Sequence, residues 1–274
     1  MTTVPSVTLS DGTSIPQLGF GTWQVPDADV TAAVEHALAL GYRHIDTAQA
    51  YGNEAGVGRA LASAGLPRDE VYLTTKLWND SHLKTDARAA IESSLEKLGV
   101  DQLDLYLIHW PATVKYGDAY IEAWDAMQEF KAEGLTRSIG VSNFHPHHLD
   151  AISGEVPVLN QVEVHPTFAQ LPLRAELASR GIAVESWSPL GSGADLGHPE
   201  LAAIAGEVGK SVAQVIIRWH LQHGLVVLPK SVTPARIAEN IDVFDFELDA
   251  DAMARIDAVD AGNRVGADPD TAGF

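Results

Sequence analysis

The sequence predicts a (β/α)8 barrel, the TIM-barrel class of α/β fold, with an N-terminal β-hairpin lid. Three observations lead to this prediction. About eight short apolar runs alternate with helical segments, and such alternation indicates a parallel sheet. Most of the helical segments end at a glycine, as helices often do. The chain has 274 residues, a length typical of such a barrel. No linker or change of composition marks a boundary, so we expect residues 1–274 to form one domain.

The hairpin is predicted at residues 7–15, where two extended pieces flank Asp11 and Gly12. A glycine-rich strand follows at 18–22, and its glycines indicate that something approaches the backbone closely. The remaining strands are expected around Ile45 and at residues 71–76, 103–109, 138–142, 159–164, 182–187 and 225–228. Helices are expected at residues 29–40, 54–64, 85–98, 119–133, 147–152, 173–180, 212–223 and 234–240. For the last of these, Thr233 is the expected N-cap and Pro234 the first helical residue.

The totals exclude several classes of protein. The formal net charge of −19 disfavours nucleic acid and anionic membranes as partners. The chain has no cysteine, which excludes disulfides, thiolate catalysis and cysteine zinc sites. No apolar run approaches the roughly 20 residues of a membrane span, and residues 1–5 show no signal-peptide pattern. We therefore expect a cytoplasmic protein that acts on a small molecule.

Polar side chains follow three consecutive predicted strands, at the end where barrels of this class carry their active sites. Asp46, Lys76 and His109 occupy these ends, and Tyr51 lies on the loop after the first of them. Lys76 beside Tyr51 would lower the pKa of the phenol, and Asp46 would hold Lys76 by an ion pair. His109 would orient a carbonyl oxygen or share in the proton transfer. The alternative is that each residue alone is a solvated loop residue or a packing residue.

Three polar residues gather around the last predicted strand and the helix that follows it. Lys230, Ser231 and Arg236 form a candidate anion site, because cations and a helix N-terminus both attract anions. The alternative is a solvated helix start. No Gly-x-Gly-x-x-Gly loop follows a strand, which argues against a Rossmann domain.

Six motifs give the chain a resemblance to the aldo-keto reductases, and most closely to bacterial members similar to 2,5-diketo-gluconate reductase. They are Gly41-Tyr-Arg-His-Ile-Asp-Thr-Ala48 with Tyr51-Gly-Asn-Glu54, Thr75-Lys-Leu-Trp78, Leu105-Tyr-Leu-Ile-His-Trp-Pro111, Ile139-Gly-Val-Ser-Asn-Phe144, Asn160-Gln-Val-Glu-Val-His-Pro166, and Leu228-Pro-Lys-Ser-Val-Thr-Pro-Ala-Arg-Ile-Ala-Glu-Asn240. The resemblance implies a catalytic tetrad of Asp46, Tyr51, Lys76 and His109. In that tetrad Tyr51 protonates the carbonyl oxygen while NADPH gives hydride to the carbon.

The resemblance also implies where the cofactor binds. Ser142, Asn143 and Gln161 match the ligands of the nicotinamide carboxamide, and Trp187 matches the aromatic residue that stacks on the ring. Lys230, Ser231 and Arg236 then become a clamp for the 2′-phosphate, so that NADPH is preferred over NADH. The other implied cofactor contacts are Gly21, Thr22, Trp23, Asp46, the loop Ser188, Pro189, Leu190, Gly191 and Ser192, then Val232 and Thr233, and the adenine contacts Glu239 and Asn240.

Three tryptophans lie at or just past predicted strand ends. In the family these positions line the substrate pocket, so Trp23, Trp78 and Trp110 are expected to bind substrate together with Tyr51 and His109. Each tryptophan alone could equally be a core residue. The segment 111–118 and the tail after Asp260 are short, and we expect an extended surface tail and an open pocket.

The run His145-Pro-His-His148 raises the alternative of a metal site. No carboxylate stands at ligand spacing nearby in the sequence, so no metal site is predicted. Asp268 and Asp270 are interpreted as a solvated tail.

The favoured function is NADPH-dependent reduction of aldehydes, ketones, small dicarbonyls or keto-sugars by a monomer. The alternative is a nicotinamide-cofactor-binding sensor or accessory protein with little turnover. A barrel hydrolase or isomerase would need an acid pair or a metal cluster at the mouth, and the sequence shows neither.

Overall fold

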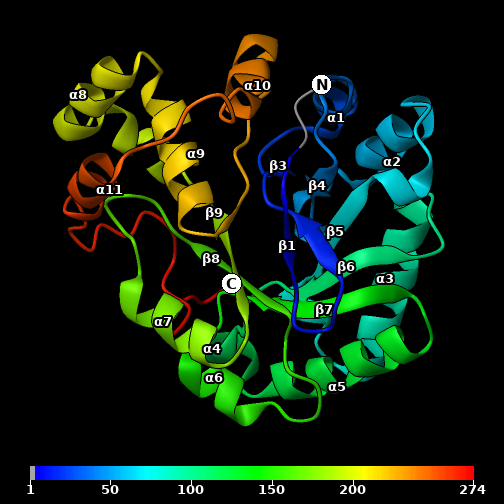
Figure 1. The fold of residues 1–274 in the computed structure, drawn as a ribbon. Helices are drawn as coiled ribbons and strands as arrows, with labels where there is room; N and C mark the ends of the chain where they lie inside the picture. The colour runs from blue at the N-terminus through cyan, green and yellow to red at the C-terminus, as the bar shows by residue number, and fades with distance from the viewer. Residues whose placement is uncertain (1–3) are drawn as a thin grey trace.

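The computed structural model describes residues 4–274 and confirms the predicted barrel. Its eight-stranded sheet has the order β10-β9-β8-β7-β6-β5-β4-β3, and every pairing in it is parallel (Figure 1). The strands are β3 (Phe20–Gly21), β4 (His44–Asp46), β5 (Tyr72–Leu77), β6 (Leu103–Ile108), β7 (Thr136–Ser142), β8 (Leu159–Glu163), β9 (Ala183–Trp187) and β10 (Val226–Val227). A parallel bridge from Leu18 to Val227 closes the sheet, and Val227 also donates its main-chain N–H to Gln17 over 2.9 Å.

The N-terminal hairpin consists of β1 (Ser6–Thr8) and β2 (Ser14–Pro16), paired antiparallel. Ile15 is fully buried and packs in one cluster with Leu105 and Leu107 of β6. Asp11, in the turn, accepts a hydrogen bond from Ser138 Oγ near the start of β7 over 2.7 Å. The hairpin therefore covers the end of the barrel at which the strands begin, away from the predicted catalytic residues.

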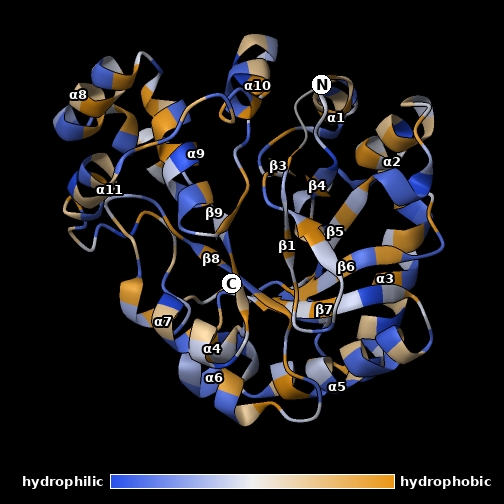
Figure 2. Ribbon diagram, in the orientation of Figure 1, coloured by the Kyte–Doolittle hydropathy of each residue, from blue (hydrophilic) through white to orange (hydrophobic). Residues whose placement is uncertain are grey.

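Helices surround the sheet, and Figure 2 shows both hydrophobic and hydrophilic residues on them. The helices are α1 (Asp27–Leu40), α2 (Glu54–Ser63), α3 (Lys84–Leu98), α4 (Thr113–Tyr116), α5 (Ala119–Ala132), α6 (Pro146–Ala151), α7 (Leu171–Ser179), α8 (Pro199–Val208), α9 (Val212–Gln222), α10 (Pro234–Ile241) and α11 (Ala250–Asp257). The largest fully buried side chains include Trp124 of α5 and Trp219 of α9. Helix α9 starts with a capping box, in which Ser211 Oγ accepts from the N–H of Gln214 and Gln214 Oε1 accepts from the N–H of Ser211.

Several local predictions need correction. Helices α4, α8 and α11 were not predicted, although Leu201, Ile204 and Ala205 of α8 have helical spacing and are buried. Thr233 precedes α10 as expected, but its side chain makes no capping hydrogen bond. At the glycine-rich strand, side chains of the protein approach the backbone of Gly19 closely. A Cβ on Gly19 would lie 2.5 Å from a methyl carbon of Leu228 and 2.6 Å from the imidazole of His44.

Within residues 4–274, no helix is both long enough and apolar enough to cross a membrane. The prediction about a signal peptide concerned residues 1–5, of which 1–3 lie outside the described part.

Candidate active site

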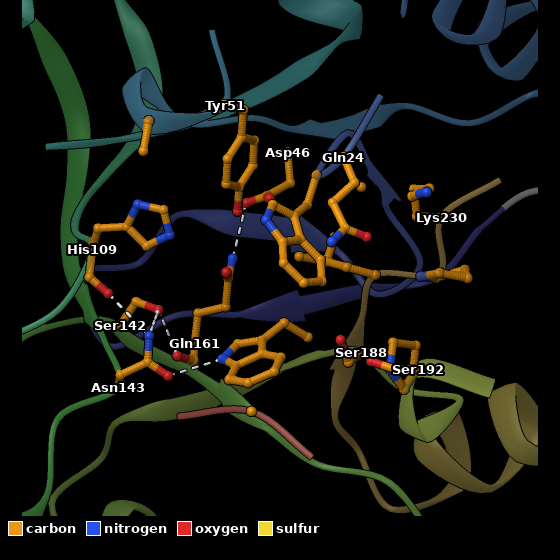
Figure 3. Close-up of a pocket in the computed structure, with 18 of the residues that line it drawn as sticks. Gln24, Asp46, Tyr51, His109, Ser142, Asn143, Gln161, Ser188, Ser192 and Lys230 are labelled. Atoms are coloured by element: carbon orange, nitrogen blue, oxygen red, sulfur yellow. Dashed lines mark hydrogen bonds between the residues drawn. The ribbon is translucent and has the colours of Figure 1, made fainter. Parts of the chain in front are cut away.

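The barrel brings the four predicted catalytic residues to one place. Asp46 ends β4, Lys76 is the next-to-last residue of β5, and His109 directly follows β6. Tyr51 ends a short 3-10 turn (Gln49–Tyr51) on the loop after β4. Parallel strands in register end side by side, and Figure 3 shows Asp46, Tyr51 and His109 around the same space.

Lys76 is the centre of this group. Its side chain is fully buried, and its Nζ lies 2.6 Å from Asp46 Oδ1 and 2.8 Å from the main-chain oxygen of Thr47. The same nitrogen lies 3.4 Å from the hydroxyl oxygen of Tyr51. An ammonium held by a carboxylate and a carbonyl has one remaining N–H, and here that N–H is directed at the phenol.

The protonation states follow from burial and charge. Burial raises the pKa of Tyr51 to about 12 and outweighs the lowering effect of the Lys76 ammonium, which corrects the expected lowering. Burial alone would lower the pKa of Lys76, but the charge of Asp46 and the neighbouring Tyr51 raise it instead. Burial and the Lys76 charge hold the pKa of His109 well below its usual value. At pH 7 the site therefore has a neutral phenol, an ammonium and a neutral imidazole.

The imidazole of His109 is held among aromatic rings. It contacts Tyr51 edge-on, with ring centroids 5.5 Å apart, and Trp78 edge-on at 5.2 Å. Trp110 lies close to Trp187, with centroids 6.4 Å apart. Trp78 and Trp110, which were predicted to bind substrate, therefore line the same cavity as Tyr51 and His109.

A second buried carboxyl, that of Glu185, is connected to Asp46 through Gln161, and the sequence did not predict it as part of the site. The amide nitrogen of Gln161 donates to Asp46 Oδ2 over 2.9 Å and to Glu185 Oε2 over 2.6 Å. Burial and the nearby charge of Asp46 raise the pKa of Glu185 to about 8, so this carboxyl is protonated at pH 7. Since both N–H groups of Gln161 are used, its amide oxygen is left for another donor. In the sequence, Glu185 is one polar residue inside a strand, with no motif of its own.

Asn143 joins three of the predicted residues. Its backbone is left-handed, with φ of 63°. Its Nδ2 donates to the main-chain oxygen of His109 and to Ser142 Oγ, both over 3.0 Å. Its Oδ1 accepts from Trp187 Nε1 over 2.9 Å, as Figure 3 shows. The indole that is predicted to stack on a nicotinamide ring is thus fixed by the amide next to Ser142.

One cavity of about 770 Å³ connects these groups with the predicted cofactor site. Its lining includes Tyr51, His109, Lys230 and Arg236, and the loop residues Ser188, Pro189, Leu190 and Ser192. Figure 3 shows His109 and Lys230 on opposite sides of the cavity. Lys230 and Arg236 are exposed, and no other residue of 4–274 forms an ion pair with either. Against a net charge of −19, two free cations in one cavity form a site for an anion.

The loop after β9 is held by a buried histidine. His165 lies 3.0 Å from Asp195 and 3.1 Å from Glu163, and these carboxylates raise the pKa of the imidazole to about 9 although burial alone would lower it. Glu163 also accepts hydrogen bonds from the N–H groups of Val265 and Gly266, over 2.6 and 2.9 Å. One charged imidazole therefore connects the loop after β9 with the C-terminal segment.

Some predicted contacts do not line the cavity. Lys76 lies behind Tyr51, and Thr22 is buried with its hydroxyl donating to the main-chain oxygen of Asp46 over 3.0 Å. The other predicted contacts outside the lining are Gly191, Ser231, Val232, Thr233, Glu239 and Asn240. Residues that line the cavity but were not predicted are Gln24, Ala50, Gly193, Leu228, Pro229, Gly266, Ala267 and Phe274.

The C-terminal segment lies at the surface as expected, and Gly266, Ala267 and Phe274 from it also line the cavity, which was not predicted. Phe274 stacks on Trp78 with centroids 6.0 Å apart and meets Trp110 edge-on at 5.1 Å. Asn79 donates to the main-chain oxygen of Phe274 over 3.1 Å. The sequence gives no periodic signal for these contacts, because they join residues far apart along the chain.

The model of the Aldo/keto reductase family matches residues 17–197 and 195–261. The chain belongs to the aldo/keto reductase family. It is 51% identical over 273 residues to an aldo-keto reductase of Mycobacterium sp., with 98% of each chain covered. It is 50% identical over 272 residues to the methylglyoxal reductase DkgA of Escherichia coli, with 97% of this chain and 98% of that protein covered. Among solved structures, a mutant of Gox0644 in complex with NADPH is 45% identical, with 100% of both chains covered and a TM-score of 0.95.

Proposed function

We propose that this chain reduces small aldehydes, ketones and dicarbonyls to alcohols, with NADPH as cofactor and Tyr51 as proton donor. The observation that carries the proposal is the position of Lys76 Nζ, 2.6 Å from Asp46 and 3.4 Å from the Tyr51 hydroxyl. Burial raises the pKa of Tyr51, so the phenol is protonated at pH 7, and the adjacent Lys76 ammonium opposes part of that rise. Lys76 then stabilises the phenolate that remains, and Asp46 keeps Lys76 in place.

The neutral His109 lines the same cavity beside Tyr51 and can donate a hydrogen bond to the carbonyl oxygen. Two groups then orient that oxygen, one of which transfers its proton. The aromatic wall of Trp78, Trp110 and Phe274 suits compact carbonyl compounds with an apolar part. Trp23, exposed at 47%, lines the same cavity and extends this wall.

The donor set of the cavity fits a nicotinamide dinucleotide with a 2′-phosphate. Trp187 offers a flat ring, and Ser142, Asn143 and Gln161 offer an amide-binding edge next to it. Lys230 and Arg236 stand free at the far end for the phosphate. When bound, the cofactor supplies the hydride for the carbonyl carbon. Ser231, Val232, Thr233, Glu239 and Asn240 remain proposed contacts of the adenosine part, outside the cavity lining.

The substrate class is proposed from the relatives and from the pocket together. DkgA proteins are named methylglyoxal reductases, so methylglyoxal is the first compound to test. The test follows NADPH oxidation with methylglyoxal, phenylglyoxal, diacetyl and a diketo-sugar acid, with NADH in parallel. Turnover with NADPH supports the proposal. Tight NADPH binding without turnover on any compound would favour a cofactor-binding sensor instead.

We also propose that the protein acts as a monomer with one domain. The residues that line the cavity are drawn from segments along the whole barrel, which supports a single domain. Light scattering should give a mass near 29.3 kDa, and urea should produce a single unfolding transition.

A further inference from the structure

Three histidines and one aspartate meet where α6 begins, although the sequence offered no nearby carboxylate. The carboxylate is that of Asp270, from the C-terminal segment. His145 Nδ1 lies 2.9 Å from Asp270 Oδ2, and His147 Nε2 lies 3.3 Å from Asp270 Oδ1. One donor atom from each of His145, His147, His148 and Asp270 lies within 4.8 Å of all the others. The fold therefore brings to the histidines the carboxylate that is absent near them in the sequence.

The spacing of these atoms fits one small ion. Zinc binds imidazole nitrogen and carboxylate oxygen at about 2.0–2.2 Å, so two ligands of a tetrahedral ion lie about 3.4 Å apart. The Asp270 carboxylate lies 2.9 Å from His145 through one oxygen and 3.3 Å from His147 through the other, and both separations are near that value. Two imidazoles and a carboxylate also form a donor set that suits zinc and its first-row neighbours.

His148 has a different part in this cluster. Its Nδ1 accepts from the main-chain N–H of His145 over 3.0 Å, so a neutral ring carries its hydrogen on Nε2. That Nε2 is buried, has no hydrogen-bond partner among the described residues, and lies 3.7 Å from Asp270 Oδ1. At this distance it makes no hydrogen bond to the carboxylate, so His148 borders the cluster and is left out of the ligand set proposed below.

We propose that His145, His147 and Asp270 bind a divalent first-row transition ion such as Zn²⁺. His147 and Asp270 are exposed at 62% and 46%, so water can reach the ion and complete its coordination. The net charge of −19 favours the approach of a cation. Nothing in the reduction chemistry described above uses this site.

The ion would link the start of α6 to the C-terminal segment, and both of these border the proposed active site. His145 stands two residues after Asn143, which holds His109 and Trp187. Asp270 stands between Ala267 and Phe274, which line the cavity. The bound ion should therefore make the C-terminal segment more rigid. This consequence for the pocket rests on the proposed function, whereas the binding of the ion does not.

The test uses the untagged protein, freed of metal, in equilibrium dialysis against Zn²⁺, with competition by a chromogenic chelator for the affinity. One Zn²⁺ per chain is expected. His147→Ala and Asp270→Asn should each weaken binding at least about tenfold, because each removes one of three protein ligands. Co²⁺ should give the intense visible absorption of a four-coordinate ion, and this absorption should be lost in both variants.

The matched control is His223→Ala. His223 forms a similar pair with Asp257, at 2.8 Å, away from the cluster. Its replacement should leave Zn²⁺ affinity unchanged. Both test positions are exposed, and circular dichroism checks that the variants fold. The proposal is overturned if no stoichiometric binding occurs, or if His147→Ala and Asp270→Asn bind Zn²⁺ as tightly as the parent. None of these readouts depends on turnover, so they stay valid if the proposed reduction is not found.

Discussion

The two ends of the candidate active-site cavity differ in whether their charged side chains are buried and paired. At the catalytic end, the Lys76 and Asp46 side chains are 0% and 4% exposed and are paired with each other. At the far end, Lys230 and Arg236 are exposed and have no ion-pair partner within residues 4–274. A buried charge without a partner costs several kcal/mol, whereas an exposed one costs almost nothing. The protein can therefore keep cations free for a ligand only where water reaches them.

The largest expected effect is on turnover at the catalytic end. Tyr51→Phe removes the proposed proton donor and should lower the rate constant for reduction by about 10²–10⁴-fold. NADPH affinity, measured by quenching of tryptophan fluorescence, should hardly change, because the phenol ring remains. Tyr72→Phe is the control, since its buried hydroxyl has no hydrogen-bond partner among the described residues. Near-normal turnover in Tyr51→Phe would mean that another group donates the proton.

The next largest expected effect is on the free energy of unfolding. Lys76→Met leaves Asp46 buried without its cation and should lower the free energy of unfolding by about 3–5 kcal/mol. Arg236→Ala, at the exposed end, should change it by less than about 0.5 kcal/mol. Urea unfolding of both variants measures the difference. If the two losses were equal, the contrast between the two ends would not hold.

Arg236→Ala should instead weaken NADPH binding. Loss of a charged hydrogen bond to a phosphate corresponds to about 1.5–3 kcal/mol, or roughly tenfold to a hundredfold in affinity. NADH affinity should stay the same, since NADH has no 2′-phosphate. Arg88→Ala, which removes an arginine paired with Glu133, serves as the control. A similar loss for both cofactors would show that Arg236 does not contact this phosphate.

The last prediction concerns how the free energy of unfolding depends on pH. The folded protein keeps Glu185 protonated up to a pKa of about 8, compared with a usual value of 4.5. Folding thus binds a proton between these values, so the Glu185 contribution is full below about pH 4.5 and is lost as the pH rises towards 8. Glu185→Gln should remove this decline. Urea unfolding at pH 5 to 8 would show parallel curves for parent and variant if Glu185 were already ionised.

The sequence predicted well which side chains meet at the end of the barrel where the strands end, because regular structure determines those positions. Parallel strands bring their carboxyl ends together, so Asp46, Lys76 and His109 could be placed from strand positions alone. The pKa of Tyr51 could not be predicted, because its direction depends on how burial compares with the Lys76 charge. Phe274 and Asp270 were missed because their contacts join distant parts of the chain through irregular structure.

Asn143 has a consequence for protein engineering. One amide fixes the main chain at His109 and the indole of Trp187, and it does so from a left-handed backbone that few residues tolerate. A substitution there should disturb both neighbours together, so the proposed roles of His109 and Trp187 should change together in such a variant. Libraries aimed at a new substrate should leave Asn143 unchanged and vary the rim of the cavity at Trp23, which is exposed at 47%.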